Sequence, residues 1–496
     1  MKERLMIAAD IGASGGKMAA AVFDGRQMHI NEYWDFPNRP ADIGTALYWD
    51  VFGLYHSVLD GLALFRGKYG QADTFAIDTW GASYGLLDGF GRLLEPVYHY
   101  RDERTSGTME DMKQVMDEWE LFQLTGCQCN RTYTLPQLYS YVVQKSRILE
   151  SAEDMLFLPD LLSYFLGGEI SCEMTIAGTS CLLENRQEDW SRQVMKRFAL
   201  PEKMLPPIVE PGNTKGSFGA WVTEKTGMQK TRIIAAVSHD SAAAVAAIPD
   251  FGKEDLYISV GTSISMGIER EDCLLTREAY EKGFKNTGGI DRRKIIYRDF
   301  SASWHINEFL RTKREEGKDY THPDLIWLAQ NTPSPRVYID VEDALLGTAG
   351  GDTCAKINDY LRRTGQPLLE KDGEFIRCIY ESIAMKARHY ACAFQELGEH
   401  FSRVYVINGG SRNGLLMQFI SNALDMEIHA GMTYATISGN LLTQLYAQGE
   451  VTSVEQMRQL SKESFELKVY EPEQGARWRE EFARYQILES SQSIKK

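Results

Sequence analysis

The chain alternates short apolar runs with segments whose composition favours helix. One passage shows this most clearly: residues 233–237 are apolar, Ser238, His239 and Asp240 form a polar break, and an Ala/Val-rich segment then continues to Pro249. The apolar run predicts a β-strand, and the Ala-rich segment predicts a helix that stops at the proline. The pattern therefore places a carboxylate, Asp240, at a strand-to-helix junction.

Such a junction has two interpretations. Open α/β sheets bind ligands just beyond the carboxyl ends of their strands, so Asp240 is a candidate active-site residue. Asp240 or Ser241 could instead cap the helix, because both residue types are good N-caps. This passage alone leaves both interpretations open.

The N-terminal pattern predicts a β-hairpin. Residues 5–23 read as two β-runs joined by a Gly/Ser turn. Backbone N–H groups of a glycine-rich turn can form a concavity that suits a phosphate, and Lys17 would add charge. The turn is not a P-loop, since Met18 stands where a hydroxyl is needed. An ordinary hairpin turn is the alternative, but Asp10 ends an apolar strand, where burial is costly without a cation or donor.

Two later stretches also place glycines directly after a β-run. Residues 255–269 again read as a β-run, a glycine with small polar residues, and a second β-run. A hairpin that opens each half of the chain predicts a duplicated fold with two phosphate-facing loops across a cleft. Residues 401–424 then read as a strand, the pair Gly409 and Gly410, and an amphipathic helix, where glycines permit close approach of a ligand. G-x-G-x-x-G is absent, so a dinucleotide-binding unit is not supported.

The remaining segments complete the outline. We expect a helix over residues 42–70, and a strand from residue 74 that enters a glycine-containing loop with Trp80. This tryptophan could belong to the core or stack on a sugar. Residues 158–180 predict helix and then extended chain, and the proline-rich passage 201–216 is a candidate domain boundary. Residues 490–496 read as a frayed tail.

Composition narrows the possible partners. The chain has 496 residues, 43% hydrophobic and 25% charged, with a net charge of -15. This negative net charge creates no overall electrostatic attraction for nucleic acid or an anionic membrane. No Lys/Arg-rich block creates a local positive patch either. No apolar run is long enough to span a bilayer, and the N-terminus does not read as a signal peptide. Its eight cysteines are scattered. We therefore expect a cytoplasmic protein that binds neither nucleic acid nor membrane.

Taken together, the motifs resemble those of the FGGY carbohydrate kinases, a branch of the actin/hexokinase-like ATPases. The resemblance covers nearly the whole chain, and within the family the chain is most similar to kinases of L-rhamnulose. The motifs that carry it start at Asp10 (DIGASGGK), Ile77 (IDTWG), Tyr100 (YRDERT), Leu158 (LPD), Ser238 (SHD), Ser259 (SVGT), Glu381 (ES) and Asn408 (NGGSRN).

The resemblance implies an α/β, two-domain actin/hexokinase-like (ribonuclease H-like) fold with a cleft between duplicated lobes. The expected domains are residues 1–232, 233–475 and a C-terminal helix and tail, 476–496. The implied activity is transfer of the γ-phosphoryl group of ATP, with Mg²⁺, to a hydroxyl of a ketose, L-rhamnulose being the leading candidate. The implied partner is a small-molecule sugar, and the protein would be a monomer or a homodimer.

The family's functional residues carry over onto matching positions. Asp240 would be the catalytic base. Trp80, Gly81, His239, Ser241 and Asp299 would contact the sugar. The nucleotide would contact Asp10, Ala13, Ser14, Gly15, Gly16, Lys17, Gly261, Thr262, Asn307, Gly409, Gly410 and Asn413. Asp10 would also face magnesium through water.

Some positions depart from the pattern of L-rhamnulose kinases, and they lie mostly on the sugar side: Ser83 replaces Asp, Asp299, Tyr133 and Ile176 replace Asn, and Tyr434 replaces Glu. Kinases of L-fuculose, L-xylulose or a polyol therefore remain alternatives. An actin- or chaperone-like ATPase is a more distant alternative, which the motifs at Asp78 and Ser238 disfavour. A catalytically silent sugar sensor is another, which the intact Asp10, Asp240 and Thr262 disfavour.

Overall fold

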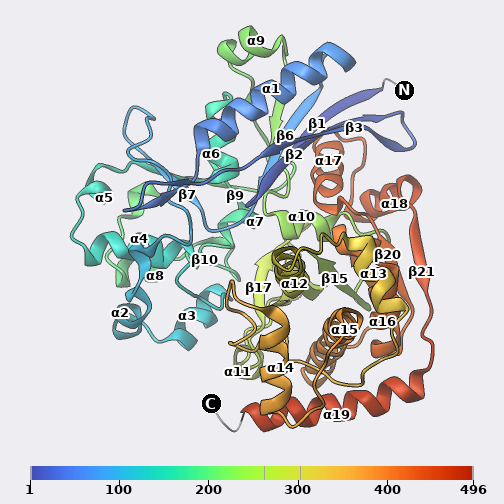
Figure 1. Ribbon diagram of the computed structural model, residues 1–496. Helices are drawn as coiled ribbons and strands as arrows, with labels where there is room; N and C mark the ends of the chain where they lie inside the picture. The colour runs from blue at the N-terminus through green and yellow to red at the C-terminus, as the bar shows by residue number, and fades with distance from the viewer. Residues whose placement is uncertain (1–2, 262, 302, 494–496) are drawn as a thin grey trace. The chain divides into compact units, whose positions relative to one another are not determined.

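The computed structural model describes residues 3–261, 263–301 and 303–493, which form two compact units (Figure 1). The first unit contains the residues up to Phe251, Glu269–Ile296 and Tyr434–Phe465. The second contains Gly252–Ile268, Tyr297–Thr433 and the residues from Glu466 onward. The domain boundaries expected after residues 232 and 475 stay predictions.

The first unit is built on a six-stranded sheet in the order β13-β14-β6-β1-β2-β3. These strands are β1 (Arg4–Gly12), β2 (Gly15–Phe23), β3 (Met28–Pro37), β6 (Thr74–Thr79), β13 (Thr214–Ser217) and β14 (Arg232–Ile234). β1 and β2 pair antiparallel, which confirms the predicted hairpin, and β6 runs parallel to β1. Consecutive short apolar runs thus become neighbouring strands of one sheet.

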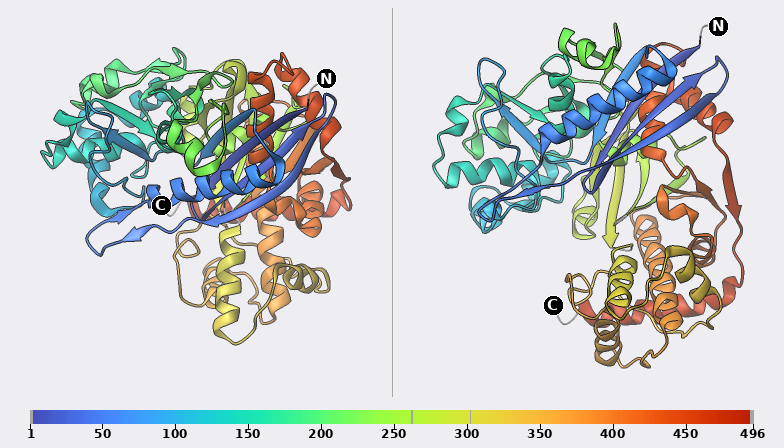
Figure 2. Two further views of the ribbon diagram at one scale, coloured as in Figure 1. Left: turned by 90° about the horizontal axis from the view of Figure 1, so that it is seen from above. Right: turned by 45° about the horizontal axis from the view of Figure 1, so that its top comes forward.

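The two-residue period of β1 separates its side chains onto two faces. Ile7, Ala9 and Ile11 belong to a core that also contains Val51 and Leu54 of α1 (Val51–Tyr69). Figure 2 shows α1 lying across this face of the sheet. The alternate residues, which include Ala8 and Asp10, therefore point to the opposite face.

That opposite face is covered by α17 (Ala435–Ala447), whose side chains bind to it through amides. Gln444 donates a hydrogen bond of 3.0 Å to the carbonyl oxygen of Ile7 and accepts one of 2.7 Å from the Thr74 hydroxyl. Asn440 donates one of 2.6 Å to Asp78 at the end of β6. Polar groups of the buried strands β1 and β6 thus find hydrogen-bond partners on a single helix.

α10 (Asp240–Ala246) packs against α17 through small residues. The contact is closest at Gly439, where a built Cβ would lie 1.8 Å from the carbonyl oxygen of Ala243. Small side chains on both helices allow this approach, so the run of alanines predicted as a helix also determines how closely α10 packs.

We predict that Gly439→Ala destabilises the first unit by about 2–3 kcal/mol, because the added methyl group cannot fit without separating the two helices. Denaturant unfolding would measure the change in the free energy of unfolding. Gly67→Ala in α1 is the matched control, since nothing lies within 4 Å of its built Cβ and alanine favours helix. Equal stability of both variants would contradict this packing account.

Two sequence expectations need correction. The helix expected over residues 42–70 begins only at Val51, after the short strands β4 (Ala41–Asp42) and β5 (Leu47–Tyr48). Asp50 caps it by accepting a hydrogen bond of 2.9 Å from the Gly53 amide, so the residues before Asp50 lie outside the helix. The stretch expected as helix then extended chain, 158–180, contains α6 (Leu158–Phe165) and β9 (Cys172–Glu173), but a further short helix, α7 (Met174–Ala177), follows β9.

The other elements of the first unit follow from the same chain segments. They are β7 (Tyr84–Leu87), η1 (Glu103–Thr105), α2 (Thr108–Val115), α3 (Glu118–Thr125), α4 (Thr134–Val143), α5 (Ile148–Ser151), β8 (Asp154–Phe157), α6 (Leu158–Phe165), β9 (Cys172–Glu173), α7 (Met174–Ala177), β10 (Leu183–Glu184), β11 (Asp189–Trp190), α8 (Arg192–Arg197), η2 (Glu202–Met204), β12 (Ile208–Val209), α9 (Ala220–Thr226), α11 (Arg277–Glu281), β17 (Lys285–Gly288), η3 (Ile290–Arg292) and α18 (Val454–Ser464).

The second unit repeats the arrangement of the first. Its sheet contains, in spatial order, β18 (Lys294–Ser301), β16 (Ser263–Arg270), β15 (Asp255–Val260), β19 (Arg403–Ile407), β20 (Ile428–Gly431) and β21 (Leu467–Tyr470). β15 and β16 form the expected antiparallel hairpin, and β19 runs parallel to β15 as β6 does to β1. The duplicated pattern in the sequence thus corresponds to a duplicated hairpin-plus-parallel-strand motif.

Helices complete the second unit: α12 (Ser303–Glu315), α13 (His322–Gln330), α14 (Thr353–Arg363), α15 (Asp372–Glu396), η4 (Gly409–Arg412), α16 (Gly414–Leu424) and α19 (Gly475–Ser493). α19 continues to Ser493, so helix replaces most of the frayed tail expected from residue 490.

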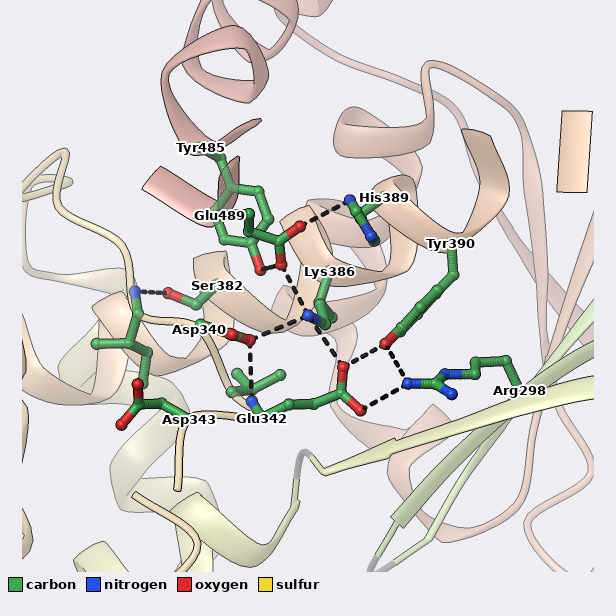
Figure 3. Close-up of polar contacts among 12 residues, drawn as sticks. Arg298, Asp340, Glu342, Asp343, Ser382, Lys386, His389, Tyr390, Tyr485 and Glu489 are labelled. Atoms are coloured by element: carbon green, nitrogen blue, oxygen red, sulfur yellow. Dashed lines mark hydrogen bonds and ion pairs between the residues drawn. The ribbon is translucent and has the colours of Figure 1, made fainter. Parts of the chain in front are cut away.

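An ion cluster fastens α19 to α15 (Figure 3). The Lys386 ammonium, almost fully buried, lies 2.7 Å from Glu489 and 3.0 Å from both Asp340 and Glu342. Burial acts against the charge of Glu489, but His389 and Lys386 together lower its pKa to about 2. The C-terminal helix is therefore an integral part of the second unit.

Candidate active site

Three carboxylates of the first unit lie at the carboxyl ends of its strands. Asp10 of β1 and Asp78 of β6 are partners in register. Asp240 begins α10, and His239 before it forms an isolated bridge with Thr79 at the end of β6. Ligands of α/β sheets bind at this edge. The structure thus brings together Asp10 and Asp240, both predicted from the sequence, and adds Asp78.

Burial and neighbouring carboxylates raise the pKa of Asp10 and of Asp78. Burial, and then the charge of Asp240, raises the pKa of Asp10 to about 7. Burial, and then the charge of Asp10, holds the pKa of Asp78 well above its ordinary range, although the hydrogen bond from Asn440 acts in the opposite direction. Carboxylates this close cannot all stay charged without a compensating positive charge. The cluster therefore favours a cation or a bound proton.

Asp240 uses its two oxygens differently. Oδ1 accepts hydrogen bonds from the amide and hydroxyl of Ser241, at 2.6 and 3.1 Å, and lies 3.6 Å from Nε2 of His239. Oδ2 has no hydrogen-bond partner among the residues that the structure describes. The Asp240 side chain is 31% exposed. One oxygen is thus held in place while the other can accept a proton from a ligand.

The predicted sugar loop is held by aromatic and hydroxyl side chains. Trp80 is 7% exposed and packs against Trp49, with ring centroids 4.2 Å apart. Gly81 lies against Thr179, whose Cβ would be 2.7 Å from a built Cβ. The next residue, Ala82, has a φ of 68°, and its amide donates to the Thr179 hydroxyl at 3.0 Å. A strained backbone fixed by surrounding bonds is typical of ligand-binding loops.

Two departures from the family pattern fall on buried positions. Ser83 is 1% exposed, and its hydroxyl accepts the indole N–H groups of Trp49 and Trp80 at 3.0 and 2.8 Å. Ile176 is fully buried in the core of the first unit. Ser83 therefore orients two tryptophans, and Ile176 packs in the core.

The N-terminal hairpin turn places its residues in two ways. Ala13 and Ser14 are exposed at the turn, whereas Gly16 packs so closely on Phe36 that a built Cβ would lie 2.0 Å from its ring. The Lys17 ammonium forms an ion pair with Asp35 and lies over the rings of Tyr33 and Tyr434, with 5.5 and 5.0 Å to the centroids. Tyr434, a departure from the family pattern, thus contacts a residue predicted to bind nucleotide. The phosphate-binding role of residues 13–17 stays a prediction.

The second unit contains a pocket of about 520 Å³. Its lining includes Gly261, Asn307, Gly409, Gly410 and Asn413, all predicted nucleotide contacts from three separate chain segments. Concave, largely apolar pockets with a few polar groups are typical ligand sites. The structure therefore gathers these residues at one place, although their role stays a prediction.

Local structure explains this pocket. Gly410 must be small, because a built Cβ would lie 2.1 Å from the Val260 side chain. Asn413 caps α16 by accepting a hydrogen bond of 3.1 Å from the Leu416 amide. The strand, Gly-Gly and helix pattern is correct in outline, but a 3₁₀ turn, η4, separates β19 from α16.

Other predicted residues lie elsewhere. Asp299, half-buried, belongs to β18 of the second unit, and Thr262 lies outside the described residues. Tyr133 is half-buried at the start of α4, with the Lys285 ammonium 6.0 Å from its ring centroid. The sugar contact predicted for Asp299 stays a prediction.

Sequence reasoning missed some residues of these sites. Asp78 ends an apolar run, as Asp10 does, and the same cost of burial could have singled it out. The pocket is also lined by Ile306, Tyr380 and Leu416, which lie on three helices and leave no local signal, since apolar residues on a helix usually read as core.

The carboxylates of the first unit suit magnesium, although they do not form a complete metal site by themselves. Within residues 3–261, 263–301 and 303–493, no group of three or more His, Cys, Asp or Glu side chains is arranged to hold a metal ion. Mg²⁺ in kinases usually keeps several waters and binds one or two carboxylates together with substrate phosphates. Asp10, in a cluster with excess negative charge, offers that chemistry.

Two further features are the state of the cysteines and the apolar character of the helices. All eight cysteines carry free thiols. Among the described helices, none combines the length and the apolar character that crossing a bilayer requires.

Comparison with known proteins identifies the family. Residues 5–247 match the N-terminal domain of the FGGY family of carbohydrate kinases, and residues 256–448 match its C-terminal domain. The chain belongs to the FGGY family of carbohydrate kinases. It is therefore an ATP-dependent carbohydrate kinase, and the resemblance noted in its sequence is confirmed.

Relatives of this FGGY kinase support a finer comparison. It is 34% identical to the rhamnulokinase of Bacteroides thetaiotaomicron over 472 residues, which are 95% of this chain and 96% of the relative. It is 30% identical to the rhamnulokinase of Enterococcus faecalis, with 95% of each chain covered. The solved gluconate kinase of Lactobacillus acidophilus superposes with a TM-score of 0.83 at 15% identity, covering 99% of this chain and 98% of its own. The predicted two-domain α/β fold is thereby confirmed.

Proposed function

We propose that this FGGY kinase transfers the γ-phosphoryl group of ATP to L-rhamnulose, giving L-rhamnulose 1-phosphate and ADP, with Asp240 as general base. The observation that carries the proposal is the arrangement of Asp240: Ser241 holds Oδ1, and Oδ2 has no partner among the described residues. The names of its relatives at 34% and 30% identity support the choice of sugar.

In the proposed reaction the hydroxyl oxygen of the sugar forms a bond to the γ-phosphorus, and the bond from that phosphorus to the β,γ-bridging oxygen breaks. The hydroxyl proton passes to Oδ2 of Asp240. Phosphoryl transfer has a loose transition state, so the base needs position more than strength. Holding Oδ1 through Ser241 supplies that position, because the carboxylate cannot rotate freely.

The nucleotide would occupy the pocket of the second unit. Ile306 and Leu416 offer an apolar surface for a base, and Asn307 and Asn413 offer polar groups to orient it. Gly409 and Gly410 leave the backbone open to close approach. The volume of about 520 Å³ lies within the range of small-ligand sites.

Asp10 would hold Mg²⁺ through water. Bound with the phosphates, Mg²⁺ would neutralise the charge of the transferring group. Its positive charge would also offset the repulsion that raises the pKa of Asp10, so the carboxylate cluster and the metal–nucleotide complex would stabilise each other.

On the sugar side, Trp80, Gly81, His239 and Ser241 would border the substrate, and Asp299 stays a predicted sugar contact. The departures at Ser83 and Ile176 weigh little against L-rhamnulose, since both side chains are buried in contacts within the first unit. The half-buried part of the sugar loop, Gly81 and Ala82, is supported by Thr179 and not by either of these residues.

We predict that L-rhamnulose is phosphorylated at its 1-hydroxyl with a kcat/KM about tenfold or more above that for L-fuculose and L-xylulose, because polar sites discriminate between hydroxyl configurations. Steady-state kinetics with each ketose, and phosphorus NMR of the product, would measure this. A higher kcat/KM for L-fuculose, L-xylulose or a polyol would reject L-rhamnulose but keep the kinase assignment.

A further inference from the structure

Glu173 is a fully buried carboxylate in the first unit that no local sequence motif singles out. It stands before the short helix α7 and caps it in the ordinary way. Oε1 accepts a hydrogen bond of 2.9 Å from the Thr175 amide, and Oε2 accepts one of 3.2 Å from the Ile176 amide. Capping explains two of its hydrogen bonds but not the others.

The remaining bonds reach the segment that precedes the proposed base. Oε2 of Glu173 accepts a third hydrogen bond, of 3.1 Å, from the amide of Ser238, 65 residues later in the chain. The Thr175 hydroxyl donates to the same oxygen at 2.6 Å and accepts from the amide of His239 at 3.2 Å. Two consecutive amides directly before Asp240 are therefore held by one carboxylate and one hydroxyl.

The same segment is also held from the other side. The amide of Thr79 donates a hydrogen bond of 2.9 Å to the carbonyl oxygen of Ser238, next to the bridge between Thr79 and His239. β14 ends at Ile234, so Ser238 and His239 lie beyond its regular ladder. These few bonds are therefore what fixes the direction in which the chain enters α10.

A carboxylate suits this position for a chemical reason. Oε2 receives three donors, more than an amide or hydroxyl oxygen usually accepts, and buried donors left without a partner are costly. A second buried ion pair contacts the backbone of Glu173. Lys215 lies 2.5 Å from Asp160, and Asp160 accepts a hydrogen bond of 3.3 Å from the Glu173 amide. A chain of buried polar contacts thus leads from Lys215 to the amides of Ser238 and His239, directly before Asp240.

We propose that Glu173 and Thr175 are positioning residues of this kinase, which hold the amides of Ser238 and His239 and thereby aim the Asp240 carboxylate. The inference rests on the proposed role of Asp240 as base. Neither residue touches the nucleotide pocket, which belongs to the other unit. Their loss should therefore reduce the rate of the chemical step and leave nucleotide binding intact.

The test is a matched pair at Thr175. Thr175→Val keeps the shape but removes both hydrogen bonds of the hydroxyl, whereas Thr175→Ser keeps the hydroxyl. A misplacement of about 1 Å can cost about 100-fold, so we expect Thr175→Val to lower kcat by roughly 10- to 100-fold and Thr175→Ser to recover most of the rate. The assay is run at pH 8, above the pKa of about 7 to which burial raises Glu173.

KM for ATP and affinity for ADP should stay within about twofold in both variants, because the nucleotide pocket is unaltered. A merely structural role would lower thermal stability and the fraction of protein that binds ADP, but it would leave kcat per ADP-binding site unchanged. Wild-type kcat per site in Thr175→Val would overturn the inference.

Glu173→Gln is the second variant if Thr175→Val does not fold. Its carbonyl can replace only one of the two oxygens, so we expect a reduced kcat per ADP-binding site, and an unchanged value would overturn the proposal. The Asp240→Asn variant distinguishes a failure of the positioning role from a failure of the proposed function. If Asp240→Asn keeps its turnover, the general base is misassigned; if it is inactive while Thr175→Val is normal, only the positioning role fails.

Discussion

Replacing Asp240 with Asn should lower kcat for sugar phosphorylation by about 1,000-fold, within the range that general bases contribute. The amide oxygen can still accept the Ser241 amide and hydroxyl that now bind Oδ1. The amide nitrogen would replace Oδ2 and cannot accept a proton. Nucleotide affinity should be unchanged, since the pocket proposed for the nucleotide belongs to the second unit and Asp240 to the first. A coupled assay of ADP release and calorimetric titration with ADP would measure the two quantities.

Asp250→Asn is the control for this experiment. Asp250 is a partly exposed carboxylate that pairs with Lys462, ten residues after Asp240 and beyond the end of α10. The same chemical change there should leave kcat within about twofold, because exposed ion pairs contribute little. Turnover of Asp240→Asn above a few per cent of the wild-type rate would rule out Asp240 as the base.

Replacing Asp10 with Asn should lower kcat by about 100-fold and raise the Mg²⁺ concentration needed for half-maximal rate, because a charge that faces the metal–phosphate complex is lost. The effect should be on Mg²⁺ dependence more than on sugar KM. Asp10 lies among carboxylates that raise its pKa to about 7, so the site favours a cation that the neutral amide no longer attracts.

Rates measured over a range of Mg²⁺ concentrations, at fixed ATP, would test this prediction. Asp60→Asn on the exposed face of α1 is the control for removal of one negative charge. An Asp10→Asn variant with the Mg²⁺ dependence and kcat of the wild type would contradict a role for Asp10 at the metal.

Much of the site could be predicted because strand ends are visible in a sequence. An acid that ends an apolar run, as Asp10 and Asp240 do, is costly to bury and therefore marks a ligand site. The alternation of β1 places Asp10 on the face opposite Ile7 and Ile11, which the two-residue period also predicts. The pair Gly409 and Gly410, which the sequence also shows, lines the pocket of the second unit.

The rest depends on contacts between distant segments. Asp78 lies beside Asp10 only because β6 pairs in parallel with β1, and no local pattern fixes that register. Glu173 reads as an ordinary helix cap until the fold brings Ser238 to it. The start of α1 was placed too early because Asp42 and Asp50 are both possible N-caps, and only the structure shows that Asp50 is the cap.

The central claim is that this FGGY kinase uses ATP to phosphorylate a sugar. The most direct measurement is ADP release by the purified protein with Mg²⁺ and ATP, in the absence of sugar and across a panel of ketoses, aldoses and polyols that includes L-rhamnulose. The account predicts ADP release that depends on sugar, is fastest with L-rhamnulose, and disappears in Asp240→Asn. ADP release that is equally fast without any sugar would contradict it.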